Sequence, residues 1–232
     1  MKVENYEGPL SYAQIVRGYQ YCIKNARELY SDAELLFNNR RYARAYALTV
    51  LSYEEIGKLM ILLTATFHES SDLDLWKKFW NRFRSHTLKR TRVSLMELLS
   101  LPNTTWEQME REWEREPLTE RLKQLALYVD WFDGRITLPS KLYSKPNLPE
   151  AAMKLARDRI EHFSKVFSGR DDPSLRKQTR WMKKEGLADS KGMTKKGMEW
   201  LENQLKEMAT SLRELASTPI QPNSTLRVDA KE

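Results

Sequence analysis

Residues 42–67 read YARAYALTVLSYEEIGKLMILLTATF, a run rich in alanine, leucine and other strong helix formers. The run contains no proline and a single glycine, so it predicts one long helix. The stretch before it, from Ser11 to Phe37, repeats apolar residues three or four positions apart, which is the spacing of an amphipathic helix. Asn38, Asn39 and Arg40 separate the two stretches. A separation this short predicts an antiparallel helix pair.

Further helical stretches follow, and prolines or glycines separate them. The pattern predicts a third helix from Asp72 to about Ser100, a fourth from Thr105 to about Phe132 with an interruption at Pro117, and another from Pro149 to Phe167. Residues 135–149, with three prolines, are expected to form an ordered connector or a long loop. No convincing β-hairpin signal is found. The fold class is therefore all-α, an antiparallel helical bundle.

The chain divides into three expected parts. Residues 1–168 are predicted to form the bundle. Residues 169–216 become rich in lysine and glycine and predict a small basic helical subdomain at the C-terminal side. Residues 217–232 are polar and contain proline, which is typical of a flexible tail.

Composition narrows the class of protein. Thirty-nine Lys and Arg residues against 32 Asp and Glu residues give a net charge of +7, which favours an anionic partner such as nucleic acid without identifying it. Cys22 is the only cysteine, so neither an intramolecular disulfide nor a cysteine-based zinc site is expected. No stretch is apolar enough to predict a membrane span. These features predict a cytoplasmic protein that does not insert into membranes.

Positive charge is concentrated in the third predicted helix. No acidic residue occurs between Asp74 and Glu97, where seven cations lie: Lys77, Lys78, Arg82, Arg84, Lys89, Arg90 and Arg92. Four aromatic residues form a stripe at helical spacing: Trp76, Phe79, Trp80 and Phe83. On a continuous helix, Arg82, His86 and Lys89 would share one edge of that stripe. The four aromatics also predict a homodimer, because they exceed what one helix pair would cover.

His86 is the main candidate for acid or base chemistry on a phosphodiester. Imidazole both accepts and donates protons near neutral pH, and an arginine such as Arg82 can bind phosphate through two parallel hydrogen bonds. The alternatives are a solvated cationic helix face and a purely structural histidine. His68 and His162 lack the spacing of a zinc site.

The second helix carries a candidate carboxylate at Glu55, which falls on a stripe with Leu51 and Leu59. A carboxylate among apolar residues needs a partner, and Lys58 on the same helix is one candidate, with Arg82 and His86 on the third helix. A structural ion pair and an active-site role both remain open for Glu55.

Two neighbours of Glu55 are interpreted more simply. Glu54 and Lys58 are expected to form an ordinary surface pair one helical turn apart. Gly57 in the middle of a helix costs about 1 kcal/mol relative to alanine. Its presence suggests that another backbone or a substrate passes close to it.

Three segments resemble one family. The run RYARAYALTVLSYEEIGK (41–58), followed by FWNRFRSHTLK (79–89), is similar to the paired signature of the AbiV group of HEPN proteins. KQLALYVDW (123–131) with Pro139 after it also resembles this group, so the likeness covers about residues 15–170. The resemblance implies a helical bundle, and many HEPN proteins are metal-independent endoribonucleases whose Arg and His act at a dimer interface. It assigns the histidine to His86 and the arginine to Arg82 or Arg84, which lie closer to His86 than in the superfamily pattern.

The resulting hypothesis is an anti-phage abortive-infection effector that binds RNA or cleaves it without a metal or cofactor. In cleavage, a ribose 2′-OH would attack the neighbouring phosphate. His86 would act as base or acid, Arg82 and Lys89 would stabilise the phosphorane, and Glu55 would orient one of them, with Lys58 beside it. The residues expected to bind RNA are Lys78, Arg84, Arg90 and Arg92. The rival hypothesis is a non-catalytic helical protein that blocks phage growth by binding a phage or host protein.

Two other features of the sequence are weaker candidates for a functional role. Asp130 could orient a cation, or it could cap or pack a helix end. Basic residues from Arg176 to Lys196, interleaved with Trp181, could grip a nucleic-acid backbone or form a solvated face.

Overall fold

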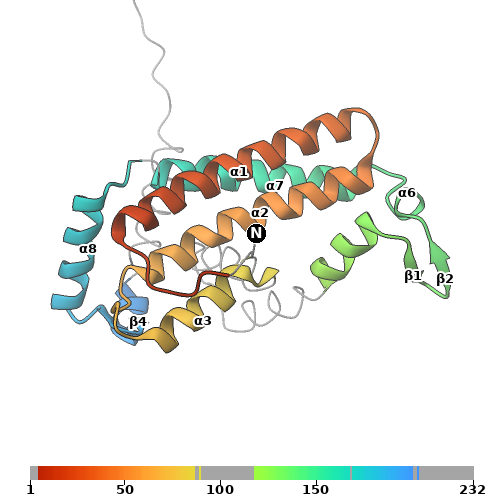
Figure 1. The fold of residues 1–232 in the computed structure, drawn as a ribbon. Coiled ribbons are helices and arrows are strands. Elements are labelled where there is room, and N and C mark those ends of the chain that lie inside the picture. Colours follow the sequence, from red (N-terminus) through yellow and green to blue (C-terminus); the bar gives the residue numbers. More distant parts are fainter. Residues whose placement is uncertain (1–4, 87–88, 90–117, 168, 201–202, 204–232) are drawn as a thin grey trace, which may run out of the picture.

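The computed structural model describes residues 5–86, 89, 118–167, 169–200 and 203. Its frame is the antiparallel pair α1 (Tyr12–Asn38) and α2 (Tyr42–Ala65), and α7 (Asn147–Phe167) packs against both (Figure 1). The predicted all-α fold, the antiparallel pair and the helix ending at Phe167 are confirmed.

The boundaries of α1 follow from local hydrogen bonds. Ser11 caps its start, because the Ser11 hydroxyl accepts from the Gln14 amide at 3.2 Å and the Gln14 side chain accepts from the Ser11 amide at 2.8 Å. At the other end the Asn39 side chain donates to the Leu35 carbonyl at 2.7 Å. Arg40 then takes a positive φ of 57° and reverses the chain into α2.

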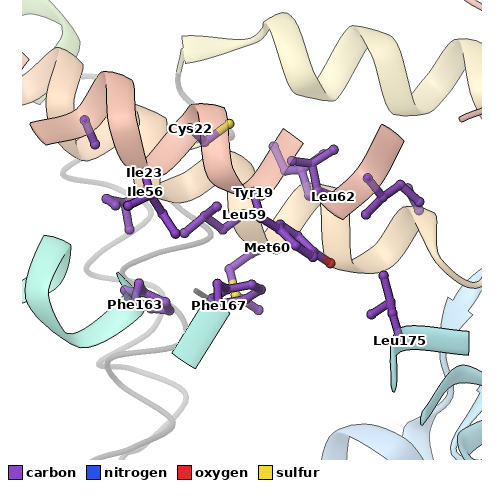
Figure 2. Close-up of a cluster of buried hydrophobic side chains, with 14 of the residues drawn as sticks. Tyr19, Cys22, Ile23, Ile56, Leu59, Met60, Leu62, Phe163, Phe167 and Leu175 are labelled. Carbon is purple, nitrogen blue, oxygen red and sulfur yellow. The ribbon is translucent and has the colours of Figure 1, made fainter. Parts of the chain in front are cut away.

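The centre of the bundle is α2, which is buried on most of its circumference. Its N-terminal half uses small residues, such as Ala45 and Ala47 with no exposed surface. Its C-terminal half contributes Ile56, Leu59, Met60 and Leu62 to the main core, which Figure 2 shows against Tyr19, Cys22 and Ile23 of α1 and Phe163 and Phe167 of α7.

The third helix is shorter than the sequence predicts. Asp72 caps α3 (Leu73–Arg84) by accepting from the Leu75 amide at 2.9 Å, and the helix ends where Ser85 becomes extended with ψ 123°. The prediction of a helix continuing through His86 is therefore wrong, and Arg82 and His86 do not share a helical edge. Residues 90–100 of that predicted helix lie outside the described residues.

The aromatic stripe of α3 is covered within the chain. Trp76 and Phe79 are each 1% exposed, and Trp80 and Phe83 pack partly buried against the same core. The Trp80 indole donates to the Gly8 carbonyl at 2.9 Å, so the N-terminal segment lies over it. Most of the stripe is thus covered by the chain itself and does not require a second subunit, while the homodimer stays a prediction.

Two small hairpins interrupt the helices, contrary to the sequence-based expectation of none. The first pairs β1 (Asp130–Phe132) with β2 (Arg135–Thr137), and it follows a helical segment at 118–127. Its turn residues Asp133 and Gly134 have φ of 51° and 73°, the pair of positive angles that a two-residue hairpin turn requires. The expected connector at 135–149 therefore contains β2 and the short helix α6 (Pro139–Leu142).

The C-terminal part contains α8 (Asp172–Lys184), the hairpin of β3 (Ala188–Asp189) with β4 (Gly192–Met193), and a helical segment at 195–200. Phe67, after α2, forms a buried cluster with Met182 and Leu187 of this part. The predicted tail at 217–232 lies outside the described residues. Within the described ranges, none of the helices is both long and apolar enough to cross a membrane.

Gly57 is required by a close backbone approach, as its position in the sequence suggests. A Cβ atom on Gly57 would lie 2.0 Å from the carbonyl oxygen of Lys89. The segment that carries Lys89 therefore crosses α2 at this glycine.

We expect Gly57→Ala to destabilise the protein by about 1 to 3 kcal/mol, because the added methyl group overpacks against backbone. An alanine at an unobstructed helical position would instead stabilise by up to about 1 kcal/mol. Urea unfolding measures the difference. Gly169→Ala is the control, since a Cβ there meets nothing within 4 Å. A Gly57→Ala protein at least as stable as wild type would contradict the crossing.

Candidate functional site

Glu54 in the middle of α2 is the most deeply buried carboxylate of the site, with 2% of the residue exposed. Its Oε1 accepts a hydrogen bond from Lys123 Nζ at 2.8 Å. Its Oε2 lies 2.5 Å from Nδ1 of His86. One carboxylate thus joins α2 to the segment after α3 and to the helical segment at 118–127.

The expectation that Glu54 is a surface residue is wrong, because Glu54 is 2% exposed, whereas the Glu55 side chain, at 14% exposed, is the less buried of the two. Following the leucines of α2 selects the stripe with Glu55, but a second stripe is buried more completely: Ala43, Ala47, Val50, Glu54, Gly57 and Ile61. Small residues on that stripe let neighbouring segments approach α2 closely. The most deeply buried side of α2 is therefore the one with the alanines and the glycine, and Glu54 lies on that side.

Lys123 is as buried as the carboxylate that it binds, at 2% exposed. Its ammonium group also lies 2.9 Å from Oε2 of Glu120, one turn earlier in the same helical segment. A buried ammonium group is tolerated only when it is paired and hydrogen-bonded, and two carboxylates meet that requirement.

His86 lies at the solvent-exposed edge of the Glu54 cluster. Its side chain is 54% exposed, although Nδ1 touches a buried carboxylate. A carboxylate beside Nδ1 holds the ring proton of a neutral imidazole on that nitrogen, which leaves Nε2 as the basic nitrogen. A carboxylate behind an accessible imidazole is an arrangement that enzymes use for general base catalysis.

Glu55 and Lys58 form a second ion pair beside the first. Lys58 Nζ lies 2.5 Å from Glu55 Oε1, and the side chains are 18% and 14% exposed, respectively. The same ammonium group sits 5.2 Å from the ring centre of Phe83, which ties the pair to the end of α3. Glu55 therefore has the partner that its partly apolar surroundings require.

Lys89 brings a further positive charge to the cluster and is 5% exposed. Burial lowers the pKa of Lys89, and the positive charge of Lys58 lowers it further, while Glu54 and Glu55 oppose the shift. Nearby, burial and then Glu55 raise the pKa of the Cys22 thiol to about 12. Cys22 is therefore protonated at neutral pH and is not a nucleophile.

The structure brings together four residues that the sequence selected as catalytic: Glu55, Lys58, His86 and Lys89. Arg82, the fifth, is exposed and its charge acts on His68 rather than at the Glu54 cluster.

The residues selected for RNA binding do not form one group. The Arg84 guanidinium donates to the Tyr6 carbonyl at 2.6 Å and stacks on Trp80 at 5.2 Å, so it anchors the N-terminal segment. Lys78 is exposed on α3. Arg90 and Arg92 lie outside the described residues.

Lys123 and the role of Glu54 were missed from sequence. The small-residue stripe of α2 could have identified Glu54. Lys123 shares a helix face with the fully buried Ala126, but a single lysine in such a place gives no specific signal.

Three other candidates, His68, His162 and Asp130, have structural roles. His68 packs edge-on against Trp76 at 5.5 Å, and burial lowers its pKa. His162 packs edge-on against Phe163. Asp130 accepts from the guanidinium of Arg121, which lowers the pKa of the carboxyl and ties the first hairpin to the 118–127 segment. Among the described residues, no three His, Cys, Asp or Glu side chains converge as a metal site would require.

Comparison with known proteins gives one match. The family model described as AbiV, within the HEPN group, matches residues 14–161. This range is more than half of the chain and includes the Glu54 cluster, but α8 and the second hairpin lie beyond it. No curated protein and no solved structure matches the chain.

We expect Glu54→Gln to destabilise the protein by about 3 kcal/mol, because it removes one partner of a buried ion pair and leaves Lys123 undercompensated. Glu55→Gln breaks a pair that is less buried, with side chains 14% and 18% exposed, and should cost clearly less. Urea unfolding of the two variants at pH 7 gives the comparison. Equal losses would show that Glu54 does not hold the cluster together.

Proposed function

Because the chain belongs to the AbiV family of HEPN proteins, we propose that it is an abortive-infection effector that binds RNA and cleaves it by acid–base chemistry at His86. The observation that carries the proposal is the contact between buried Glu54 and Nδ1 of an imidazole that is 54% exposed. A histidine needed only for packing would not combine a buried carboxylate on one side with access from solvent on the other.

In the proposed reaction, Nε2 of His86 takes the proton of a ribose 2′-OH. The 2′ oxygen attacks the adjacent phosphorus, the bond from phosphorus to the 5′ oxygen breaks, and that oxygen receives a proton. The products are a 2′,3′-cyclic phosphate and a 5′-hydroxyl. Glu54 stabilises the imidazolium that forms during the first proton transfer.

Lys58 and Lys89 would supply the positive charge that the phosphorane needs. Arg82 was expected to do this, but its side chain belongs to another surface, so we assign the role to the two lysines around α2. The lowered pKa of Lys89 makes its ammonium group a better proton donor to the departing 5′ oxygen than an exposed lysine would be. No step of this scheme requires a metal ion.

The proposal predicts that the purified protein cleaves total RNA in the presence of EDTA and that His86→Ala reduces the rate about 100-fold or more. His162→Ala is the matched control, since His162 is an exposed histidine on α7 away from the cluster. Circular dichroism should be the same for all three proteins. Cleavage that persists in His86→Ala would exclude His86 as the base.

A second candidate function, binding of a phage or host protein, is favoured by the first hairpin. Trp131 and Ile136 are paired across its strands and are 61% and 73% exposed. Neighbouring Tyr128 and Val129 are also exposed. An apolar cluster of this kind on a two-stranded ribbon is typical of an interaction surface.

A cavity of about 670 Å³ beside this hairpin indicates the chemistry of such a partner. Apolar residues such as Leu127 and Leu138 line it together with Arg40, Arg41 and Arg44. The charge favours a protein segment with an apolar anchor between carboxylates.

If protein binding at the hairpin contributes to defence, Trp131→Ser with Ile136→Ser should reduce protection of phage-infected cells without changing RNA cleavage in vitro. The measurement is plaque formation beside the cleavage assay. Leu35→Ser is the control, because Leu35 is similarly exposed, at 64%, on α1. If cells expressing the hairpin variant are protected from phage as well as cells expressing the wild type, protein binding at the hairpin does not contribute to defence.

A further inference from the structure

The exposed side of α8 is cationic from Arg176 to its end at Lys184. With 100° per residue, its five cations fall within an arc of about 120°: Arg176, Lys177, Arg180, Lys183 and Lys184. The opposite side carries the buried residues Leu175, Thr179 and Met182. Trp181, which is 42% exposed, lies at the border of the arc, one turn from Lys177 and next to Lys184 in space.

Acidic residues neutralise little of this face. Asp172 pairs with Arg176, whose guanidinium also lies 4.6 Å from the ring centre of Tyr12. Asp171 is used to cap the helix, accepting from the Ser174 amide at 2.8 Å. In the part of the chain that the structure describes, the other four cations of α8 form no salt bridge.

The face is held in place by the rest of the fold. Leu175 belongs to the main core, and Met182 packs in the cluster around Phe67. After the helix, the Thr194 hydroxyl donates to the Gly186 carbonyl at 2.7 Å and fastens the second hairpin to the end of α8. The cations of α8 are therefore displayed on a docked helix rather than on a loose appendage.

The cationic face continues onto α3. Lys78 and Arg82 are both exposed and lie one turn apart on the same side of that helix. Burial lowers the pKa of His68, and the charges of Arg82 and Lys183 lower it further, while a backbone hydrogen bond at Ser190 and the charge of Asp72 oppose the shift. Figure 1 shows α3 and α8 at the same end of the bundle, with β4 between them. Cations from both helices therefore lie close enough to His68 to act on it, at the end of the bundle that α3 and α8 share.

We propose that this α3–α8 surface binds the phosphate backbone of single-stranded RNA, with Trp181 stacking on a base. The choice of RNA rests on the proposed function, whereas the surface itself is recognised by its charge and its exposed indole. Proteins generally bind single-stranded nucleic acid with cations along its phosphate backbone and with aromatic side chains that stack on its bases. Because α3 runs about 18 Å and ends at Ser85, RNA docked along it is led toward His86.

The test measures binding of a fluorescein-labelled 20-nucleotide oligouridine by anisotropy, in a His86→Ala background so that the probe stays intact. We expect Lys177→Glu with Arg180→Glu and Lys184→Glu to weaken binding more than about tenfold. The slope of log affinity against log salt should fall by about 2, as the loss of three phosphate contacts on a single strand implies. Trp181→Ala alone should weaken binding about fivefold or more.

The control reverses three exposed charges elsewhere with the same change in net charge: Lys24→Glu, Arg27→Glu and Lys154→Glu. Thermal melts of both triple variants confirm folding, and the corresponding glutamine variants repeat the test with milder substitutions. Control and α8 variants with equal affinity would overturn the proposal. Tighter binding of polyglutamate than of oligouridine of equal charge would also overturn it, because the face would then prefer acidic protein to RNA.

This binding test is separate from the cleavage test. Binding through α8 with no cleavage by the wild-type protein would leave the α3–α8 surface standing and remove the proposed nuclease. The opposite result is cleavage that depends on His86 together with an RNA affinity that the α8 substitutions leave unchanged. It would support the proposed nuclease and remove the α3–α8 surface as the RNA-binding site.

Discussion

The carboxylate of Glu54 is the constraint on which the rest of the site depends. It is buried at the centre of α2, where an unpaired charge would be costly, so its two oxygens must be satisfied by groups from other segments. Lys123 comes from the helical segment at 118–127 and His86 from the segment after α3. One interaction therefore holds three distant parts of the chain together and also sets the proton on His86. Stability and chemistry are coupled here, because the groups that compensate the buried charge are the groups proposed to act on RNA.

The long helices were predictable because their apolar periodicity is strong and their ends carry capping residues. Ser11 and Asp72 both act as the N-terminal caps that their side chains favour. The rotational phase of α2 was harder, since a helix buried on most sides has no single apolar stripe. The spacing of its leucines places Glu55 on the apolar stripe. The alanines and Gly57 instead lie on the side of α2 where other backbones come closest. The close approach of other segments to this side of α2 makes Glu54, rather than Glu55, the centre of the site. That approach depends on the tertiary structure and not on the local sequence.

Two departures from the sequence-based expectation have different origins. Nothing in the run around Ser85 breaks a helix locally, so tertiary contacts outweigh local preference: His86 bonds to Glu54, and the Lys89 backbone crosses Gly57. The first hairpin, in contrast, was signalled by Asp133-Gly134 between two apolar runs, because that dipeptide favours the positive φ angles of a tight turn. Lys123 could not be identified from sequence at all, because its meaning depends on the carboxylate opposite it.

The break at Ser85 also explains how the arginine and the histidine of the family motif come to serve different surfaces. On a continuous helix, Arg82 and His86 would lie on one edge and act on one phosphate. The extended Ser85 instead turns His86 inward to α2, while Arg82 stays on the outer side of α3, near His68 and α8. Positive charge at the His86 site must then come from Lys58 and Lys89, which the sequence places on either side of α3. Arg82 is then free of the His86 site and belongs to the surface that we propose for RNA binding, which includes α8, a helix outside the matched family range. The break at Ser85 thus separates the proposed site of proton transfer at His86 from a region of positive charge that includes Arg82.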